Sequence, residues 1–220
     1  MHGLILADFT IRGLPRHCVI VNAGTADPLV HNVHFVDCGQ QNIKANPDAG
    51  GRGVRGGIVE YSRFEYTTTS RGSYTNAISG IGAIAWIVRH NLFRNIRAPE
   101  GQLAGPALLF RGGARDTVVD SNTFINCQRG VSFGMVENIP RDHSGGTIRN
   151  NFFHRSRDES GDTAFSLWNT PGTHVVHNTV LVSGTYQASI DYRWADSSAL
   201  VIANNLLDAS IWQRGAGAVA

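Results

Sequence analysis

The stretch AIAWIVRHNLFRNI, residues 83–96, decides the fold, because variants of it recur along the chain. Each variant has apolar residues, then asparagine, one variable residue and a large apolar residue. Clear copies occupy residues 117–127, 146–156, 173–183 and 199–210, and weaker copies carry Phe9, Phe35 and Phe64 in the apolar slot. The steps between successive apolar slots, from Phe9 to Leu207, are 26, 29, 29, 31, 29, 27 and 27 residues. A nearly fixed period of this length indicates a repeat architecture.

Each repeat has room for two or three short strands. The repeated phrase itself is expected to form the first strand. Alternating segments bounded by Gly, Asn or Pro predict a second strand in residues 18–24, 42–48, 76–82, 107–113, 130–136, 164–170 and 189–195. No stretch has a sustained 3.6-residue apolar period with caps, so helices are not expected beyond about one turn. This pattern predicts an all-β parallel β-helix, in which each coil pairs with the next.

The asparagine slot has a structural explanation. At a β-helix corner, an inward asparagine can bond the turn backbone and the asparagines of the coils above and below. The residues concerned are Asn91, Asn122, Asn151, Asn178 and Asn205. We therefore predict a structural ladder rather than a ligand site. Phe93, Phe124 and Phe153 are expected to stack inside the coil.

Composition limits the function classes. The hydrophobic fraction of 42% and charged fraction of 16% suit a globular protein. A net charge of +2 is too small to imply nucleic acid, and no apolar run approaches the ~20 residues of a membrane helix. The three cysteines, with Cys18 the first, do not predict a disulfide framework. Cys38 and Cys127 lie three repeats apart, roughly 14 Å at the spacing of stacked strands, and are expected to be buried structural residues.

Alternation assigns the faces of the second strands. If Ile43, Ile78, Leu108, Val131, Phe165 and Ile190 point inward, an outer stripe is formed by Ile20, Asn22, Lys44, Asn46, Ser79, Ile81, Leu109, Arg111, Ser132, Gly134, Ser166, Trp168, Asp191 and Arg193. Its cations, carboxylate, hydroxyls and tryptophan suit a sugar-binding surface. The alternative is an ordinary polar face on which Arg111 and Arg193 pair with nearby acids. Loops at 46–57, 65–76 and 136–146 interrupt the repeat, and such insertions often mark the binding face of a solenoid.

The N-x-F phrases, together with GQLAGPALLF (101–110) and NTFINCQRGVSFG (122–134), resemble the pectate-lyase-like superfamily of polysaccharide-active proteins. The resemblance covers nearly the whole chain and implies a right-handed parallel β-helix solenoid of about eight coils. It also implies that the protein binds or cleaves an acidic polysaccharide in an extracellular or periplasmic setting. The motifs that carry it form coils, and no catalytic signature of the family accompanies them.

Cleavage of a uronate polymer by β-elimination requires neutralisation of the carboxylate, a base and an acid. Lyases of this fold often use Ca²⁺ or cationic side chains for the neutralisation, so Ca²⁺ is a candidate cofactor. Lys44 and Arg111 are the predicted catalytic residues, together with His143, which is expected to be exposed in its loop. The predicted substrate-binding residues are Asn46, Trp168, Asp191 and Arg193.

Other chemistry has less support. Hydrolysis would require two carboxylates at a set separation, and the stripe offers no adjacent pair. Asp158, Glu159 and Asp162 cluster as a solvated turn or a Ca²⁺ loop, and no His/Cys set has zinc-ligand spacing. Two functions remain: a polysaccharide lyase or hydrolase, and a non-catalytic module for carbohydrate binding, adhesion or structure.

The ends of such a coil stack raise a separate question. We expect one domain over residues 1–220, and we favour a segment of a longer parent because the chain starts and stops within the repeat pattern. Unpaired strand edges at the ends would be covered by the terminal segments, by parent sequence or by self-association.

Overall fold

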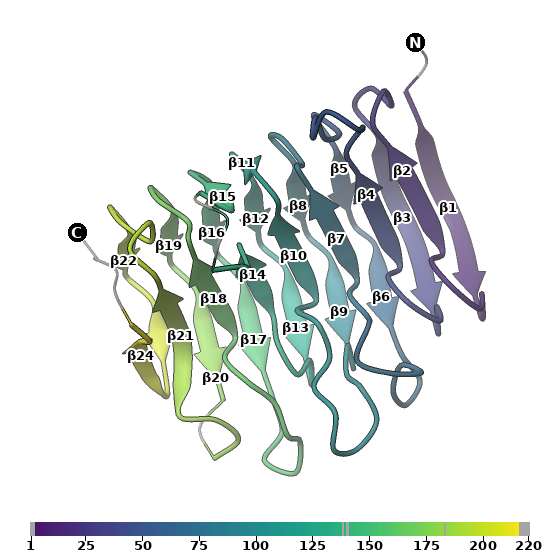
Figure 1. Ribbon diagram of the computed structural model, residues 1–220. Helices are drawn as coiled ribbons and strands as arrows, with labels where there is room; N and C mark the ends of the chain where they lie inside the picture. The colour runs from purple at the N-terminus through teal and green to yellow at the C-terminus, as the bar shows by residue number, and fades with distance from the viewer. Residues whose placement is uncertain (1–2, 138, 140, 183, 216–220) are drawn as a thin grey trace.

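The computed structural model describes residues 3–137, 139, 141–182 and 184–215. Within these residues the regular elements are all strands, and none of them is an α-helix. Every strand pairing is parallel and joins strands about one repeat apart. Figure 1 shows the resulting stack of coils, which runs from β1 at one end to β24 at the other. The predicted all-β parallel β-helix is confirmed.

The first sheet has two halves that meet at the asparagine corner. One half comprises β5 (Ile58–Glu60), β8 (Ile87–Arg89), β12 (Val118–Asp120), β16 (Thr147–Arg149), β19 (His174–Val176) and β22 (Val201–Ala203). The other comprises β6 (Arg63–Glu65), β9 (Leu92–Arg94), β13 (Thr123–Ile125), β17 (Phe152–His154), β20 (Thr179–Leu181) and β23 (Leu206–Leu207). The longer strands β1 (Ile5–Arg12) and β3 (Leu29–Val36) extend across both halves.

The second sheet forms the opposite layer and carries the predicted second strand of each repeat (Figure 1). In the described part of the chain it contains β2 (Val19–Asn22), β4 (Ile43–Asn46), β7 (Ile78–Ile81), β10 (Leu108–Arg111), β14 (Val131–Phe133), β18 (Phe165–Trp168), β21 (Ala188–Arg193) and β24 (Ser210–Gln213). A small third sheet pairs β11 (Ala114–Arg115) with β15 (His143–Ser144).

The repeated phrase is not one strand, as the sequence predicted, but two. The residue before each ladder asparagine has a left-handed backbone, with φ of 54° at His90 and 56° at Ser121. Such a residue leaves the extended region, so the chain turns a corner between β8 and β9 and again between β12 and β13. Sequence alternation alone does not reveal this corner, because polar residues other than glycine occupy it.

The asparagine ladder is confirmed. The Oδ1 of Asn122 accepts hydrogen bonds from both the backbone N and the Nδ2 of Asn91, each at 3.0 Å. The Nδ2 of Asn122 donates to Asn151 Oδ1 at 3.0 Å and to the carbonyl of Val88 at 2.9 Å. The same pattern continues through Asn178 to Asn205. The buried amides therefore satisfy one another and the corner backbone.

The aromatic slot is confirmed as core for most coils. Phe35, Phe64, Phe93, Phe124 and Phe153 stack in sequence, with ring centroids 4.6–5.9 Å apart. Phe9 is wrongly assigned to this column. It pairs with Val33 and is 40% exposed, whereas Ile11 lies over Phe35.

The cysteine prediction needs a correction. Cys18 and Cys38 form a disulfide, with Cα atoms 5.7 Å apart. The sequence argument considered Cys38 against Cys127 and overlooked Cys18, which lies one coil before Cys38. Cys127 is free and fully buried, as expected, and burial raises its thiol pKa to about 12.

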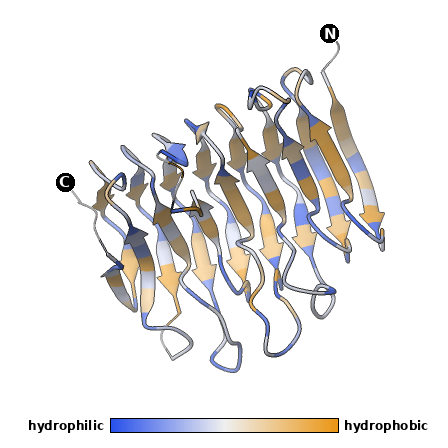
Figure 2. Cartoon of the chain, viewed as in Figure 1, coloured by the Kyte–Doolittle hydropathy of each residue, from blue (hydrophilic) through white to orange (hydrophobic). Residues whose placement is uncertain are grey.

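The core is continuous along the stack, and Figure 2 shows hydrophobic residues along the strands and hydrophilic ones in most connecting loops. Among the described residues there is no helix with the length and hydrophobicity needed to cross a membrane.

Candidate functional site

The outer face of the second sheet carries the predicted stripe. The residues predicted to point inward, such as Ile43 and Ile78, belong to the continuous hydrophobic core. Most of the residues predicted to point outward in the middle of the stripe are also buried: Ser79, Leu109, Ser132 and Ser166. The register aligns Lys44, Ser79, Leu109, Ser132, Ser166 and Asp191 in one row across β4, β7, β10, β14, β18 and β21. The two ends of this row differ: Lys44 borders an open pocket, whereas Asp191 is fully buried.

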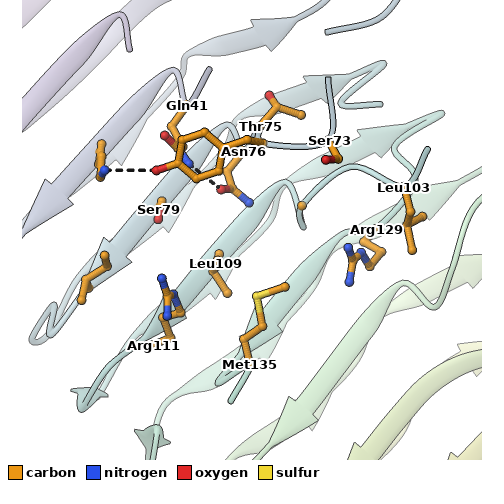
Figure 3. Close-up of a pocket in the computed structure, with 14 residues that line it drawn as sticks. Gln41, Ser73, Thr75, Asn76, Ser79, Leu103, Leu109, Arg111, Arg129 and Met135 are labelled. Atoms are coloured by element: carbon orange, nitrogen blue, oxygen red, sulfur yellow. Dashed lines mark hydrogen bonds between the residues drawn. The ribbon is translucent and has the colours of Figure 1, made fainter. Parts of the chain in front are cut away.

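The pocket lies over β4, β7 and β10 and has a volume of about 310 Å³. We call it the cationic pocket. It is lined by Gln41, Lys44, Ser73, Tyr74, Thr75, Asn76, Ser79, Ile81, Leu103, Gly105, Leu109, Arg111, Arg129 and Met135. In Figure 3, Arg111 and Arg129 lie on either side of Leu109 and Met135. None of these lining residues is an aspartate or glutamate, so the three cations give the pocket a positive potential.

The cations of the pocket, Lys44, Arg111 and Arg129, form none of the ion pairs found among the described residues. Arg129 is close enough to Asp162 and Asp191 for their charges to favour its charged form. The Nε of Arg111 is buried and donates to no hydrogen-bond acceptor among the described residues. Arg129 donates from Nε and Nη2 to the carbonyl of Ala104, at 3.0 and 2.7 Å, which fixes its guanidinium at the pocket wall. Burial lowers the pKa of Arg129, but a guanidinium stays charged at neutral pH.

Two loops build the wall. The predicted insertion 65–76 supplies four of the lining residues, and the segment before β10 supplies Leu103 and Gly105. The Gly105 N donates to the Ser73 carbonyl at 3.1 Å, and Asn76 Nδ2 donates to the Pro106 carbonyl at 2.5 Å. A Cβ on Gly105 would lie 2.5 Å from the Asn76 amide, so the close contact between the loops requires glycine here.

Tyr74 stands at the edge of the pocket and is 55% exposed. The Nζ of Lys44 donates to the Tyr74 hydroxyl at 3.2 Å. Partial burial opposes ionisation of the phenol. The hydrogen bonds from Lys44 and Gln41 and the charges of Lys44 and Arg111 outweigh that effect and lower the pKa of Tyr74 from its ordinary value.

The other end of the row forms a closed cluster, which we call the Trp168 network: Trp168, Asp191, Arg193 and Arg214. Asp191 Oδ2 accepts hydrogen bonds from Trp168 Nε1, Arg193 Nε and Arg214 Nη1, each at 3.2 Å. The Arg193 guanidinium lies 4.1 Å from the centroid of the Trp168 ring. Burial raises the pKa of Asp191 more than Arg193 and Trp168 lower it.

No family model and no curated protein matches the sequence. Among solved structures, the chain is similar to PfbA, a surface protein and adhesin of Streptococcus pneumoniae, with a TM-score of 0.51 and 11% identity. The match covers 98% of this chain and 66% of the adhesin chain. The chain is a parallel β-helix. At this identity the similarity shows the fold alone.

The seven predicted site residues do not lie together in one site. Lys44 and Arg111 meet at the cationic pocket. Asn46 lies at the end of β4, outside the pocket lining, and its Nδ2 donates to Asn22 Oδ1 at 3.2 Å. The expectation of an exposed sugar surface at Trp168 and Asp191 is wrong, because Trp168 is 8% exposed and Asp191 is fully buried.

The expectation that His143 is exposed is also wrong. Its ring is fully buried, stacks on Phe133 with centroids 3.9 Å apart, and bonds Thr117 Oγ1 through Nε2 at 3.0 Å. Burial lowers its pKa from 6.5 to about 3. The loop sequence PRDHSGG suggested a solvated turn. His143 instead belongs to β15, and its side chain faces the core.

Sequence reasoning missed Tyr74, Arg129 and Gln41. Tyr74 lies in the loop 65–76 that was identified as an insertion, which was the available signal for it. Arg129 precedes β14 and reaches the pocket only through the packing of the coils.

No described His, Cys, Asp and Glu side chains gather in a group that could hold a metal ion. In the predicted acidic turn, Glu159 pairs with Arg97, and Asp162 lies 4.0 Å from Arg214.

Proposed function

We propose that the protein is a binding module for an acidic polysaccharide, which docks in the cationic pocket. The observation that carries the proposal is the presence of Lys44, Arg111 and Arg129 in one pocket without a carboxylate in its lining. A cation without an internal partner gains most from an anionic ligand, because charge-assisted hydrogen bonds are roughly twice as strong as neutral ones.

The remaining lining suits a sugar ring. Gln41, Ser79 and Asn76 offer groups that can hydrogen-bond hydroxyls, while Leu109 and Met135 offer apolar contact to the C–H faces. A pocket of about 310 Å³ holds part of a chain rather than a long polymer, and its open edge lets the polymer continue along the coils.

The likeness to a surface adhesin supports a module that works outside the cell, where acidic polysaccharides are displayed. The disulfide between Cys18 and Cys38 supports the same setting, because disulfides persist in oxidising compartments. An extracellular or periplasmic location is therefore part of the proposal.

Affinity electrophoresis in gels that contain polygalacturonate tests the proposal. The wild type should be retarded, and it should migrate freely through the carboxyl-reduced, neutral polymer. Arg111→Ala should weaken binding by about 10- to 100-fold, since a hydrogen bond to a charged group contributes about 1.5–3 kcal/mol.

The matched control is Arg149→Ala. Arg149 lies on β16 of the first sheet and is paired with Asp120 at 2.9 Å. This variant removes the same charge from a different face, so its binding should stay within about twofold of wild type. Equal weakening in both variants would show that net charge, and not the pocket, retains the polymer.

A further inference from the structure

We propose that the protein associates with a second copy of itself through the outer face of β9, β13, β17, β20 and β23. These strands belong to the first sheet, whereas the cationic pocket lies on the second. Figure 1 shows β9, β13, β17 and β20 side by side. We call this surface the β17 face, because β17 is its middle strand. The association does not depend on the proposed binding function.

The β17 face is formed by the residues that alternate with the buried aromatic column. Phe93, Phe124 and Phe153 are fully buried, so the residues on either side of each point outward. The register aligns the outward residues in two rows, which continue past β20 to β23 and Asp208. The first row is Leu92, Thr123, Phe152, Thr179 and Leu206, and the second is Arg94, Ile125, His154, Leu181 and Asp208.

The two rows form an apolar patch with charges only at its ends and a histidine at its centre. Half of the ten side chains are aliphatic or aromatic, and Phe152 is 37% exposed and Leu206 65% exposed. On the preceding coil, β6 carries Arg63 and Glu65 at the equivalent positions, and the two form an ion pair. The patch therefore ends at β9. Apolar residues that adjoin one another on a surface, with charges at the rim, are typical of a contact with another protein.

Both rows are complementary to themselves when their order is reversed. The first row reads Leu-Thr-Phe-Thr-Leu in either direction along the stack. In the second row, reversal about His154 places Arg94 opposite Asp208 and Ile125 opposite Leu181. A two-fold axis that lies in the contact plane, parallel to β17, produces this reversal. Because a two-fold dimer brings the same surface of both copies together, a self-complementary face favours a second copy over an unrelated partner.

The charges at the two ends support this arrangement. Arg94 is exposed and forms none of the ion pairs found among the described residues. Asp208 is exposed, and its Oδ1 accepts a hydrogen bond from the Val182 N at 2.7 Å, which holds the carboxylate at the edge of the face. In the dimer each Arg94 lies over the Asp208 of the other copy. The contact therefore contains two ion pairs, one at each end.

The size of the face determines the strength of the contact. Five strands at ~4.8 Å and about six residues per coil at ~3.3 Å give a face of roughly 24 by 20 Å. Two such faces bury about 1,000 Å², which is near the lower limit for a specific interface. We therefore expect a weak, reversible dimer. The second sheet stays uncovered in it, so a ligand can occupy the cationic pocket of each copy.

Sedimentation velocity of the wild type tests the proposal over a range of about 1–500 µM, because a dissociation constant on the order of 10–100 µM is expected for a contact of this size. The mean mass should rise from that of one chain towards that of two. A wild type that is still monomeric at the highest concentration would overturn the proposal.

Phe152→Arg is the first variant. Phe152 lies on the two-fold axis, so the change brings two like charges together and removes the central apolar contact. Dimerisation should weaken by about tenfold or more. The matched control is Ile20→Arg, because Ile20 is 51% exposed on β2 of the second sheet. This variant adds the same charge elsewhere and should dimerise like the wild type. Unchanged melting temperatures show that both variants are folded.

Charge reversal tests the orientation of the two copies. Arg94→Asp and Asp208→Arg should each weaken dimerisation, because like charges then meet at both ends. An equimolar mixture of the two variants should dimerise again, because every end contact in the mixed dimer joins opposite charges. A mixture that stays monomeric would overturn the reversed arrangement. Association that persists in all three variants would place the contact elsewhere, such as at the strand edges of the stack, and would overturn the proposal.

Discussion

The cationic pocket and the Trp168 network occupy the same outer face of the same sheet, yet they present opposite electrostatics. Lys44 and Asp191 belong to one row of aligned residues. In the pocket, the cations converge without a carboxylate. In the network, one buried carboxylate receives hydrogen bonds from two arginines and a tryptophan. Residue type therefore does not distinguish a ligand site from a structural cluster on this face. The distinction is whether the arginines form ion pairs with a carboxylate of the protein.

The two regions therefore have different roles, one in stability and one in ligand binding. Burying a carboxylate costs free energy unless the carboxylate is fully hydrogen-bonded. The hydrogen bonds of Arg193 and Arg214 to Asp191 offset that cost, so these donors are not available to a ligand. An unpaired arginine at a half-buried position keeps donors for a ligand. We expect perturbations of the network to change stability and perturbations of the pocket to change binding.

The largest expected effect follows from breaking the network. Asp191→Ala removes the shared acceptor, which leaves Arg193 without a carboxylate and Arg214 with only Asp162 at 4.0 Å, and should lower the free energy of unfolding by about 3 kcal/mol or more. Urea denaturation measures this loss. The exposed turn residue Asp158 is the control, and Asp158→Ala should change stability by less than about 0.5 kcal/mol.

The same variant tests the comparison directly. Where Asp191→Ala is still folded, its freed arginines should add polygalacturonate retention to that of the pocket. Unchanged stability and unchanged retention together would show that pairing with Asp191 is not what distinguishes the two regions.

The asparagine ladder is an uncharged hydrogen-bond network whose loss can be compared with the loss of the charged Trp168 network. Asn122→Leu leaves the backbone N of Asn91 without its acceptor, removes one of the acceptors of Asn91 Nδ2, and should cost about 1–3 kcal/mol. Asn46→Leu, outside the ladder, should cost about 0.5 kcal/mol or less. Thermal melting of both variants decides the matter, and equal melting temperatures would argue against a structural ladder. Polymer retention should be the same in both.

His143 extends the comparison to the core. Its folded-state pKa of about 3 lies below the value of 6.5 for an exposed histidine. The unfolded chain therefore binds the extra proton between these values, and the neutral ring contributes stability that is complete above pH 6.5 and decreases as the pH falls towards 3. The slope is about 1.4 kcal/mol per pH unit. His143→Gln should remove this part of the pH dependence in urea titrations, and an identical slope in variant and wild type would contradict the assignment.

The smallest expected effect is that of Arg193→Ala on polymer binding. Because Arg193 is stacked on Trp168 and bonded to Asp191, its loss should change polygalacturonate affinity by less than about twofold, even where it lowers stability. Arg111→Ala on the same face should weaken binding. Similar losses in the two variants would show that the binding face extends over both regions.

Several features of the site were accessible from the sequence. Period-two alternation placed Lys44 and Arg111 on the outer face, and the interruption of the repeat at 65–76 marked a wall of the pocket. Neither signal reveals which cations keep an internal partner. Arg193 and Arg111 occupy similar positions at the ends of their strands, and their difference depends on Asp191, two residues before Arg193 on β21, and on Arg214, which follows β24.

The sequence by itself determined the coil. A recurrent Asn two residues before a large apolar residue requires equivalent positions to stack. Each buried amide then hydrogen-bonds the amide of the next coil, and each aromatic ring packs on the ring of the next coil. The tertiary structure alone decided the disulfide of Cys18, the burial of His143 and the pairing of Arg214 with Asp191. These depend on contacts between residues far apart in the chain, and burial and charge pairing are properties of such contacts rather than of residue type.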